Sequence, residues 1–280
     1  MTRFRKGDHG DPATVRFEAA GLRWLGEAVP GGGAAVVEVL AEGPGWLETR
    51  RVSEGRPDAA AAEDFGRAVA RTHAAGAPHF GAPPAGWSAE GFMGRAPLPL
   101  RAAAPAGRDS WGRFYAEERI LPYLAAATAN GSIDSAGART VERCAARVAD
   151  GALDAPQPGL VRGAVARVHG DLWSGNVLWA RDGAGTSDRA RPGEPGHGVV
   201  ATLIDPAAHG GHAESDLAQL ALFGAPHLDR ILGAYAEASP PAPGWRERVG
   251  LHQLHMLVVH AALFGGPYGA QTVRTAARYA

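Results

Sequence analysis

The feature that most constrains this chain is a polar loop set between two short apolar segments in its second half. Val165 to Val168 leads into His169-Gly-Asp-Leu-Trp-Ser-Gly-Asn176, and Val177-Leu-Trp179 follows. A second apolar stretch, Val199 to Ile204, ends at Asp205. Short apolar runs bounded by glycine and polar residues indicate buried strands. The pattern therefore predicts acidic and amide side chains placed at the ends of buried strands.

Phosphoryl transfer needs the side chains that this loop carries. A carboxylate must orient the acceptor hydroxyl and take its proton, and oxygen ligands must hold Mg²⁺ against nucleotide phosphates. Protein kinases use H-R-D, four residues, an Asn and a later metal-binding Asp at the end of a strand. In this chain His169-Gly-Asp171 is followed after four residues by Asn176, and later by Asp205. Asp and Asn are common in turns, so the order, spacing and strand context together predict a kinase-like site.

The rest of the chain divides into a small mixed part and a mainly helical part. Residues 13–28 have apolar residues at helical spacing, while Ala34 to Leu40 and Trp46 to Val52 look like strands. This layout predicts an α+β, two-lobed kinase-like fold, with an N-lobe over 1–55 and a C-lobe over 56–280. Further helices are expected from Pro57 to Gly76 and over 135–150, 214–223, 227–238, 246–264 and 268–280.

Two other segments carry local signals. A helix that begins after the predicted N-cap Ser110 must kink or end at Pro122, because proline lacks the backbone N–H. Residues 181–198 are rich in Gly, Pro, Asp and Arg, which predicts a mobile surface insertion.

Composition and charge narrow the class of protein. The chain has 280 residues, with 28 Lys plus Arg against 29 Asp plus Glu, a formal net charge of -1. Binding a nucleic-acid backbone needs a surplus of positive charge, so no nucleic-acid partner is expected. Cys144 is the single cysteine, which excludes an intramolecular disulfide and indicates a reducing compartment. Its helical Ala and Val neighbours indicate a small buried residue.

Neither a signal peptide nor a membrane span is expected. No apolar run follows the basic N-terminus, and the best apolar run, Met256 to Phe264, is short and contains His260. We therefore expect a cytoplasmic protein with no membrane partner. His252, His255 and His260 share a predicted helix, but their spacing gives no clean metal-binding pair on one face, so we assign them no metal.

The loop and the segment after Asp205 together resemble the fructosamine/ketosamine-3-kinase family, which shares the aminoglycoside-phosphotransferase-like fold. The resemblance rests on the loop His169–Asn176 and on Asp205-Pro-Ala-Ala-His-Gly-Gly-His-Ala-Glu214. Aminoglycoside and choline kinases share the H-x-D-x-x-x-x-N skeleton, and Trp173 separates this family from them. The resemblance implies ATP-dependent phosphorylation of a ketosamine, at the sugar 3-hydroxyl, on a small molecule or a glycated protein lysine.

The resemblance also implies roles for individual residues. Asp171 corresponds to the catalytic base, and Asn176 and Asp205 correspond to the Mg²⁺ ligands. Trp173 would offer a flat face to the sugar, with a core aromatic as the alternative. The residues expected to support the site are His169, which would brace the loop, and His212 and Glu214, which would hold the metal-site loop by hydrogen bonds; His209 fits either a structural or a functional role.

The N-terminal part departs from the family's pattern. Phe4-Arg-Lys6 looks like the end of the strand whose Lys reaches the ATP phosphates, and Glu18 looks like its partner on the following helix, so Lys6 and Glu18 are the expected ion pair. In the family a phosphate-covering hairpin precedes that strand, so we expect a truncated N-lobe. The alternatives are another small-molecule kinase of the aminoglycoside or choline type, and a catalytically weak sugar-binding pseudokinase.

Overall fold

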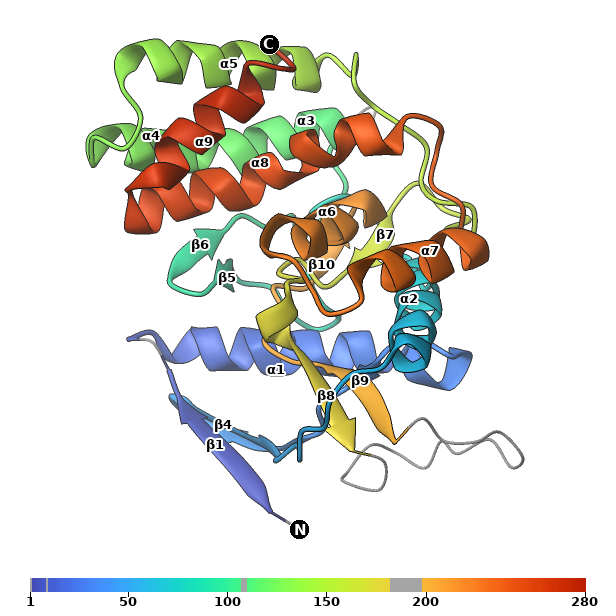
Figure 1. Cartoon of the computed structure of the whole chain (residues 1–280). Helices are drawn as coiled ribbons and strands as arrows, with labels where there is room; N and C mark the ends of the chain where they lie inside the picture. Colours follow the sequence, from blue (N-terminus) through green and yellow to red (C-terminus); the bar gives the residue numbers. More distant parts are fainter. Residues whose placement is uncertain (1, 9, 107–109, 182–197) are drawn as a thin grey trace.

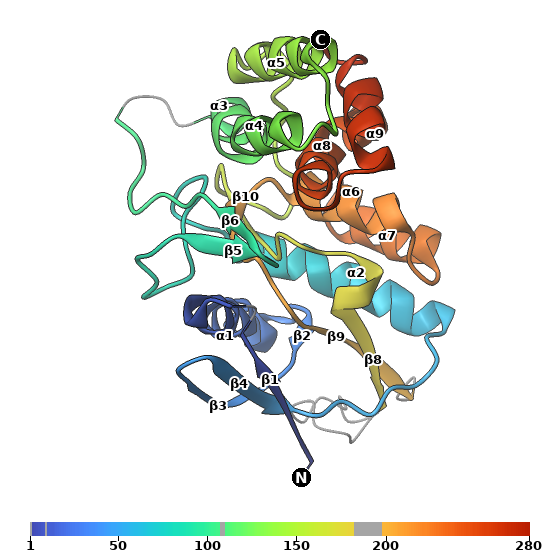
Figure 2. The same ribbon diagram turned by 90° about the vertical axis from the view of Figure 1, so that its left-hand side faces the viewer.

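A computed structural model describes residues 2–8, 10–106, 110–181 and 198–280 of the chain. The first part forms a small antiparallel sheet covered by one helix, α1 (Pro12–Gly26) (Figure 1). The strands of this sheet are, in spatial order, β1 (Arg3–Gly7), β4 (Trp46–Arg50) and β3 (Val39–Gly43). Seen end-on in Figure 2, α1 lies between this sheet and the β5–β6 hairpin (Gly91–Met93 and Ala96–Leu98).

Helix α1 forms where the sequence supplies both a cap and an apolar face. The Asp11 side chain accepts a hydrogen bond of 2.8 Å from the Ala13 N–H, which satisfies one free donor at the helix start. Val15 and Leu22 are buried on the face that packs against Leu47 of the sheet. The sheet therefore fixes α1, and α1 carries Glu18 toward the cleft described below.

The single strand expected over residues 34–40 is wrong, because the chain changes sheets within it. β2 (Ala35–Val36) pairs in parallel with β9 (Val199–Leu203), whereas β3 starts at Val39 and pairs with β4. A continuous valine-rich pattern shows that a segment is extended and buried. It does not show that two different sheets share the segment.

The remaining strands surround the polar loop. β9 lies between β2 and β8 (Val177–Arg181), and β7 (Ala166–Val168) pairs with β10 (His209–Gly211). The strands predicted on both sides of the loop and before Asp205 are therefore confirmed.

The second part of the chain is mainly helical, as expected. The helices predicted from the sequence are present, with ends shifted by no more than about a turn. They are α2 (Ala59–Ala74), α5 (Ser135–Ala149), α6 (Ala213–Phe223), α7 (Leu228–Ala238), α8 (Trp245–Phe264) and α9 (Pro267–Ala276).

The helix after Ser110 widens before it reaches Pro122. Ser110 caps α3 (Trp111–Tyr115), a π-helical turn follows over Ala116–Ile120, and α4 (Leu121–Ala129) continues with Pro122 in its first turn. A wider turn removes the need for a proline N–H, since the hydrogen-bond ladder restarts there. A π-helical turn thus interrupts the α-helix just before Pro122.

Several further expectations can be placed. Cys144 is buried within α5, as predicted, and burial raises the pKa of its thiol to about 11. Residues 182–197, most of the predicted insertion, lie outside the described residues. Among the described residues, no helix is long and apolar enough to cross a bilayer.

Helices α2 and α7 approach closely at one glycine. A methyl group at Gly66 of α2 would lie 2.2 Å from the Ile231 carbonyl oxygen of α7. Gly66→Ala is expected to lower the free energy of unfolding by about 1–3 kcal/mol, because overpacking forces the helices apart. Gly233→Ala, on the exposed face of α7 with open space around it, should be neutral or stabilising by up to about 1 kcal/mol. Urea unfolding of the two variants tests this, and equal effects would contradict it.

Candidate active site

The polar loop leaves β7 at His169 and turns back through a short 3-10 helix, Ser174–Asn176, into β8. This turn brings the side chains of Asp171 and Asn176 together. The Asn176 amide Nδ2 donates to Asp171 Oδ2 at 3.0 Å and to the Asp171 carbonyl at 2.8 Å. The amide nitrogen of Asn176 is used in these hydrogen bonds, so its amide oxygen is the atom that can bind a metal ion or accept a hydrogen bond.

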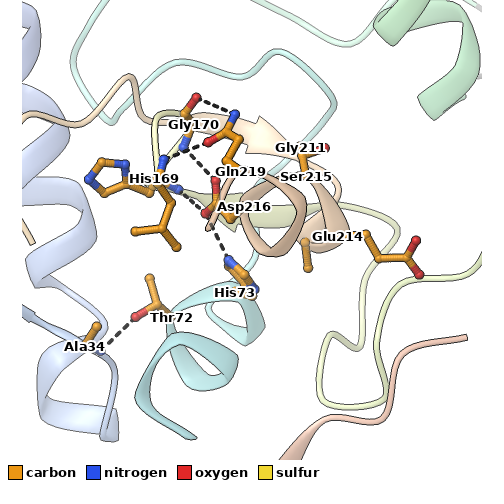
Figure 3. A network of polar contacts seen from close by, with 12 residues as sticks. Ala34, Thr72, His73, His169, Gly170, Gly211, Glu214, Ser215, Asp216 and Gln219 are labelled. Carbon is orange, nitrogen blue, oxygen red and sulfur yellow. Dashed lines mark hydrogen bonds and ion pairs between the residues drawn. The ribbon is translucent and has the colours of Figure 1, made fainter. Parts of the chain in front are cut away.

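One carboxylate from α6 holds the backbone of this loop. Asp216 Oδ2 accepts from the His169 N–H at 2.7 Å, and Oδ1 accepts from the Gly170 N–H at 3.0 Å (Figure 3). Gln219, three residues later on the same helix face, donates to the Gly170 carbonyl at 3.0 Å and accepts from the Leu172 N–H at 2.7 Å. Gly170 has a φ of 81°, and a Cβ there would lie 2.2 Å from the Ala207 oxygen.

We call Asp216 and Gln219, which hold the loop backbone, the clamp. Its contacts continue into α2 and α7. His73 Nε2 lies 3.0 Å from Asp216 Oδ2, and His73 Nδ1 lies 2.8 Å from the Tyr235 hydroxyl. Burial alone would raise the pKa of Asp216, but hydrogen bonds from His73 and from the loop N–H groups hold that pKa below its ordinary value. Asp216 is therefore an ionised group in the protein interior, paired on every side that the loop presents.

His169 makes the contacts of a brace, as expected from the sequence. Its Nε2–H donates to the Ile204 carbonyl at 2.9 Å, and its Nδ1 accepts from the Asp171 N–H at 3.2 Å. Burial lowers the pKa of His169, so the ring is neutral. It joins the loop to the strand that leads to Asp205.

Asp205 and Glu18 both contact Lys6. Lys6 Nζ lies 2.5 Å from Glu18 Oε2 and 2.7 Å from Asp205 Oδ1, so the expected Lys6–Glu18 ion pair is present. The backbone of Asp205 has a φ of 51°, a left-handed conformation that Asp tolerates better than most residues. Lys6 thus connects the N-terminal sheet and α1 to the end of β9.

Two carboxyl groups share the single ammonium of Lys6 in this triad, so their ionisation is coupled. Burial and the nearby Asp205 carboxylate raise the pKa of Glu18 to about 8. For Asp205 burial acts in the same direction, but Lys6 outweighs it and lowers the pKa of Asp205. A further cation bound beside these carboxyl groups would favour the ionised form of Glu18.

The residues near Asp205 have the chemistry that Mg²⁺ requires. The Asp205 side chain is 48% exposed, and its backbone carbonyl lies 3.5 Å from Asn176 Nδ2. Carboxylate and amide oxygens are the hard ligands that Mg²⁺ prefers. Asn176 and Asp205 therefore fit the role of metal ligands that the sequence assigned to them.

Trp173 is exposed beside the candidate base. Its exposed fraction is 38%, and its ring covers Gly175, where a Cβ would lie 2.2 Å from the indole. The alternative of a core aromatic is therefore wrong. A flat face next to Asp171 is open to a ligand.

His212 and Glu214 lie away from Asp205. His212 Nδ1 accepts from the Glu214 N–H at 3.2 Å and caps α6, while Arg248 donates to both oxygens of Glu214, at 2.9 and 2.6 Å. His252 Nε2 lies 3.3 Å from the same carboxylate. Among the described residues their hydrogen bonds fix α6 against α8, so they support the helix that carries Asp216. His209 is buried, and its Nδ1–H donates to the Ala207 carbonyl at 2.7 Å.

Sequence reasoning did not assign roles to the residues of the clamp. Asp216 and Gln219 closely follow the Asp205–Glu214 segment and lie three residues apart, which would place them on one face of the helix that begins there. That signal was available. His73 and Tyr235 carried no signal, because they meet Asp216 only after α2 and α7 have folded against α6.

Comparison with solved structures defines the class of protein. A choline/ethanolamine kinase family protein from Mesorhizobium loti superposes with a TM-score of 0.56 at 17% identity, covering 99% of this chain and 82% of that one. At this identity the likeness shows the fold alone. The expected protein-kinase-like fold of the small-molecule phosphotransferases is therefore confirmed.

The particular family follows from closer relatives. The fructosamine kinase family model matches residues 15–279, so the chain belongs to the fructosamine kinase family. A candidate fructosamine-3-kinase from Thermobifida fusca superposes with a TM-score of 0.79 at 40% identity, covering 99% of this chain and 85% of that one. A candidate ketoamine kinase from Synechocystis is 32% identical over 207 residues, which are 74% of this chain. The matched region spans only 58% of that relative's length.

The burial of Asp171 gives a pH-dependent stability. Burial, with a smaller effect from Asp205, raises the pKa of Asp171 to about 7, above its value of about 4 in an unfolded chain. Ionised Asp171 therefore destabilises the fold by an amount that grows between about pH 4 and pH 7 and is constant above that. Asp171→Asn should stabilise the protein at about pH 8 and have little effect near pH 4. Urea unfolding without divalent cations checks this, with exposed Asp150→Asn as the control; a gain independent of pH would contradict it.

The clamp predicts a large loss of stability in one conservative variant. Asp216→Asn keeps the shape of the side chain but removes the charge and turns an amide toward N–H donors. We expect a loss of about 3 kcal/mol or more, typical of breaking a buried ionic network. Exposed Asp229→Asn on α7 should change stability by less than about 0.5 kcal/mol. Thermal and urea unfolding measure both, and a mild effect at Asp216 would show that the loop is held elsewhere.

Proposed function

We propose that this chain transfers the γ-phosphoryl group of ATP to the 3-hydroxyl of a ketosamine sugar. The observation that carries the proposal is the contact of Asn176 with both Asp171 and Asp205, in a chain of the fructosamine kinase family. A related protein of Mus musculus, named ketosamine-3-kinase, is 31% identical over 164 residues. That name supports the choice of the 3-hydroxyl.

Asp171 is the group suited to accept the proton of the hydroxyl. A general base works best when its pKa lies near the working pH, and burial raises the pKa of Asp171 to about 7. The Asn176 amide fixes one carboxylate oxygen at 3.0 Å, which leaves the other to face an acceptor. His169 and the Asp216 clamp hold the loop still while the proton moves.

The nucleotide side is provided by Lys6, Asp205 and Asn176. Lys6 would bind ATP phosphate oxygens, and Glu18 at 2.5 Å would keep its ammonium in place. Mg²⁺, when bound by Asn176 and Asp205, would neutralise phosphate charge. Lys6, which contacts Asp205 at 2.7 Å in the structure, would be free to bind phosphate when that carboxylate holds the metal ion instead.

The acceptor is a ketosamine on a small molecule or on a protein lysine, and the exposed Trp173 ring would cover the C–H face of the sugar. We place the protein in the cytoplasm, since its single cysteine is buried and calls for no oxidising compartment.

Asp171→Asn should lower kcat by roughly 10²–10⁴-fold on a fructosamine substrate, the usual effect of removing a positioned acid–base group. Asp205→Ala should abolish Mg²⁺-dependent turnover and weaken MgATP binding. ADP release with and without a fructosamine measures the first, and calorimetry with MgATP measures the second, with Asp150→Asn as the control. Wild-type turnover in Asp171→Asn would remove this residue from the mechanism.

The choice of acceptor is tested with the wild-type protein. Turnover of choline or an aminoglycoside, with none of a ketosamine, would contradict the proposal that the acceptor is a ketosamine.

A further inference from the structure

An exposed row of aromatic rings leads away from the candidate catalytic loop. It starts at Trp173, whose ring lies edge-on to Phe223 at a centroid distance of 5.9 Å. Phe223 lies 5.4 Å from His260, which in turn lies 5.4 Å from Phe264. We call these four residues the aromatic row. Its members come from the loop, from the last residue of α6 and from the C-terminal end of α8, which Figure 1 places beside the start of α9.

The rings of the row are unusually open to solvent. The exposed fractions are 38% for Trp173, 39% for Phe223 and 70% for Phe264, and the neighbouring Leu263 is 40% exposed. Single exposed apolar residues are ordinary on a protein surface and need no explanation. A contiguous run of them marks a surface that binds something apolar.

The row presents flat faces without charge. The His260 Nδ1–H donates to the Met256 carbonyl at 2.8 Å, and burial lowers the pKa of His260, so its ring is neutral near pH 7. The Tyr268 ring continues the surface 4.9 Å from His260. Such faces favour apolar groups and, through the π-electrons, a cation lying close to a ring.

The start of the row indicates what would lie on it. The backbone N–H of Trp173 donates to the backbone carbonyl of Asp171 at 3.1 Å, so the row begins two residues along the loop from the candidate base. Lys6 and Asp205 mark the phosphate side of the cleft, where they contact each other. A hydroxyl held at Asp171 with its sugar on Trp173 leaves the rest of the acceptor to extend along the row.

We propose that the aromatic row binds the amine-borne part of the acceptor, and that the preferred acceptors are ketosamines of apolar or aromatic amines. This inference rests on the proposed function and adds the class of carrier to it. The sugar lies on Trp173, the secondary ammonium beside it is stabilised by the neighbouring ring faces, and the substituent on the amine covers Phe223, His260 and Phe264. Carriers that are small or end in a charge gain nothing from the row.

The test uses ketosamines that share one sugar and differ only in the amine. The carriers are methylamine, hexylamine and benzylamine, and a second set places fructosyl-lysine in peptides between two Gly or between two Phe residues. The wild-type protein should show kcat/KM at least about tenfold higher for hexylamine and benzylamine than for methylamine, or roughly 1.4 kcal/mol. The two sets distinguish a free amine from a peptide as the source of the carrier.

Phe264→Ala should remove most of that preference and leave kcat/KM for the methylamine compound unchanged. Phe264 is 70% exposed, so the variant should keep the wild-type melting temperature. Leu160→Ala, which removes a 39% exposed apolar side chain from the loop before β7, is the control and should keep the preference. An undiminished preference in Phe264→Ala, or an equal loss for all carriers, would overturn the inference.

Equilibrium binding separates this inference from the proposed function. Calorimetry with the methylamine and benzylamine compounds is carried out on the wild type and on Phe264→Ala. If no ketosamine is turned over but benzylamine compounds bind more tightly through Phe264, the binding role of the aromatic row is supported and the kinase proposal is contradicted. If ketosamines are turned over with no carrier preference in turnover or binding, the kinase proposal is supported and the binding role of the aromatic row is contradicted.

Discussion

The structure around the candidate site depends on a single buried carboxylate. Asp216 binds two successive N–H groups of the loop and the imidazole of His73, and all of these lie in the interior. A buried charge that loses a partner costs far more than an exposed one, so each partner is fixed in place. The direction of Asp171 therefore depends on contacts made by helices α2 and α6, which lie on either side of the loop in the sequence.

The parts of this arrangement that are local in sequence could be predicted, and those that depend on distant partners could not. The cap at Ser110, the strands around the loop and the positions of Asp171 and Asn176 follow from spacing and from residue type. The pairing of His73 with Asp216 joins residues 143 positions apart, and no pattern in either segment encodes it. The division of residues 34–40 between two sheets has the same origin, since β2 pairs with a strand that comes much later in the chain.

The group formed by Lys6, Glu18 and Asp205 differs from Asp216 in how many donors each carboxyl group has. The Asp216 carboxylate is fully matched by donors, whereas Glu18 and Asp205 compete for one ammonium. Burial and the nearby Asp205 raise the pKa of Glu18, and the left-handed backbone of Asp205 is a separate conformational cost. Such costs persist where the surrounding structure imposes them, and they are characteristic of sites that await a charged ligand.

The two sides of the loop therefore differ in what they contribute to the fold. On the inner side, Asp216, Gln219 and His73 cannot change without loosening the backbone that carries Asp171. On the outer side, Phe264 is largely exposed and contributes little to the core. Residues of the second kind can be substituted at little cost to stability, so acceptor preference can vary within this fold while the phosphoryl-transfer geometry is kept. In the proposed function, a fixed inner network beside an apolar surface that tolerates substitution would allow one kinase-like fold to accommodate different carriers.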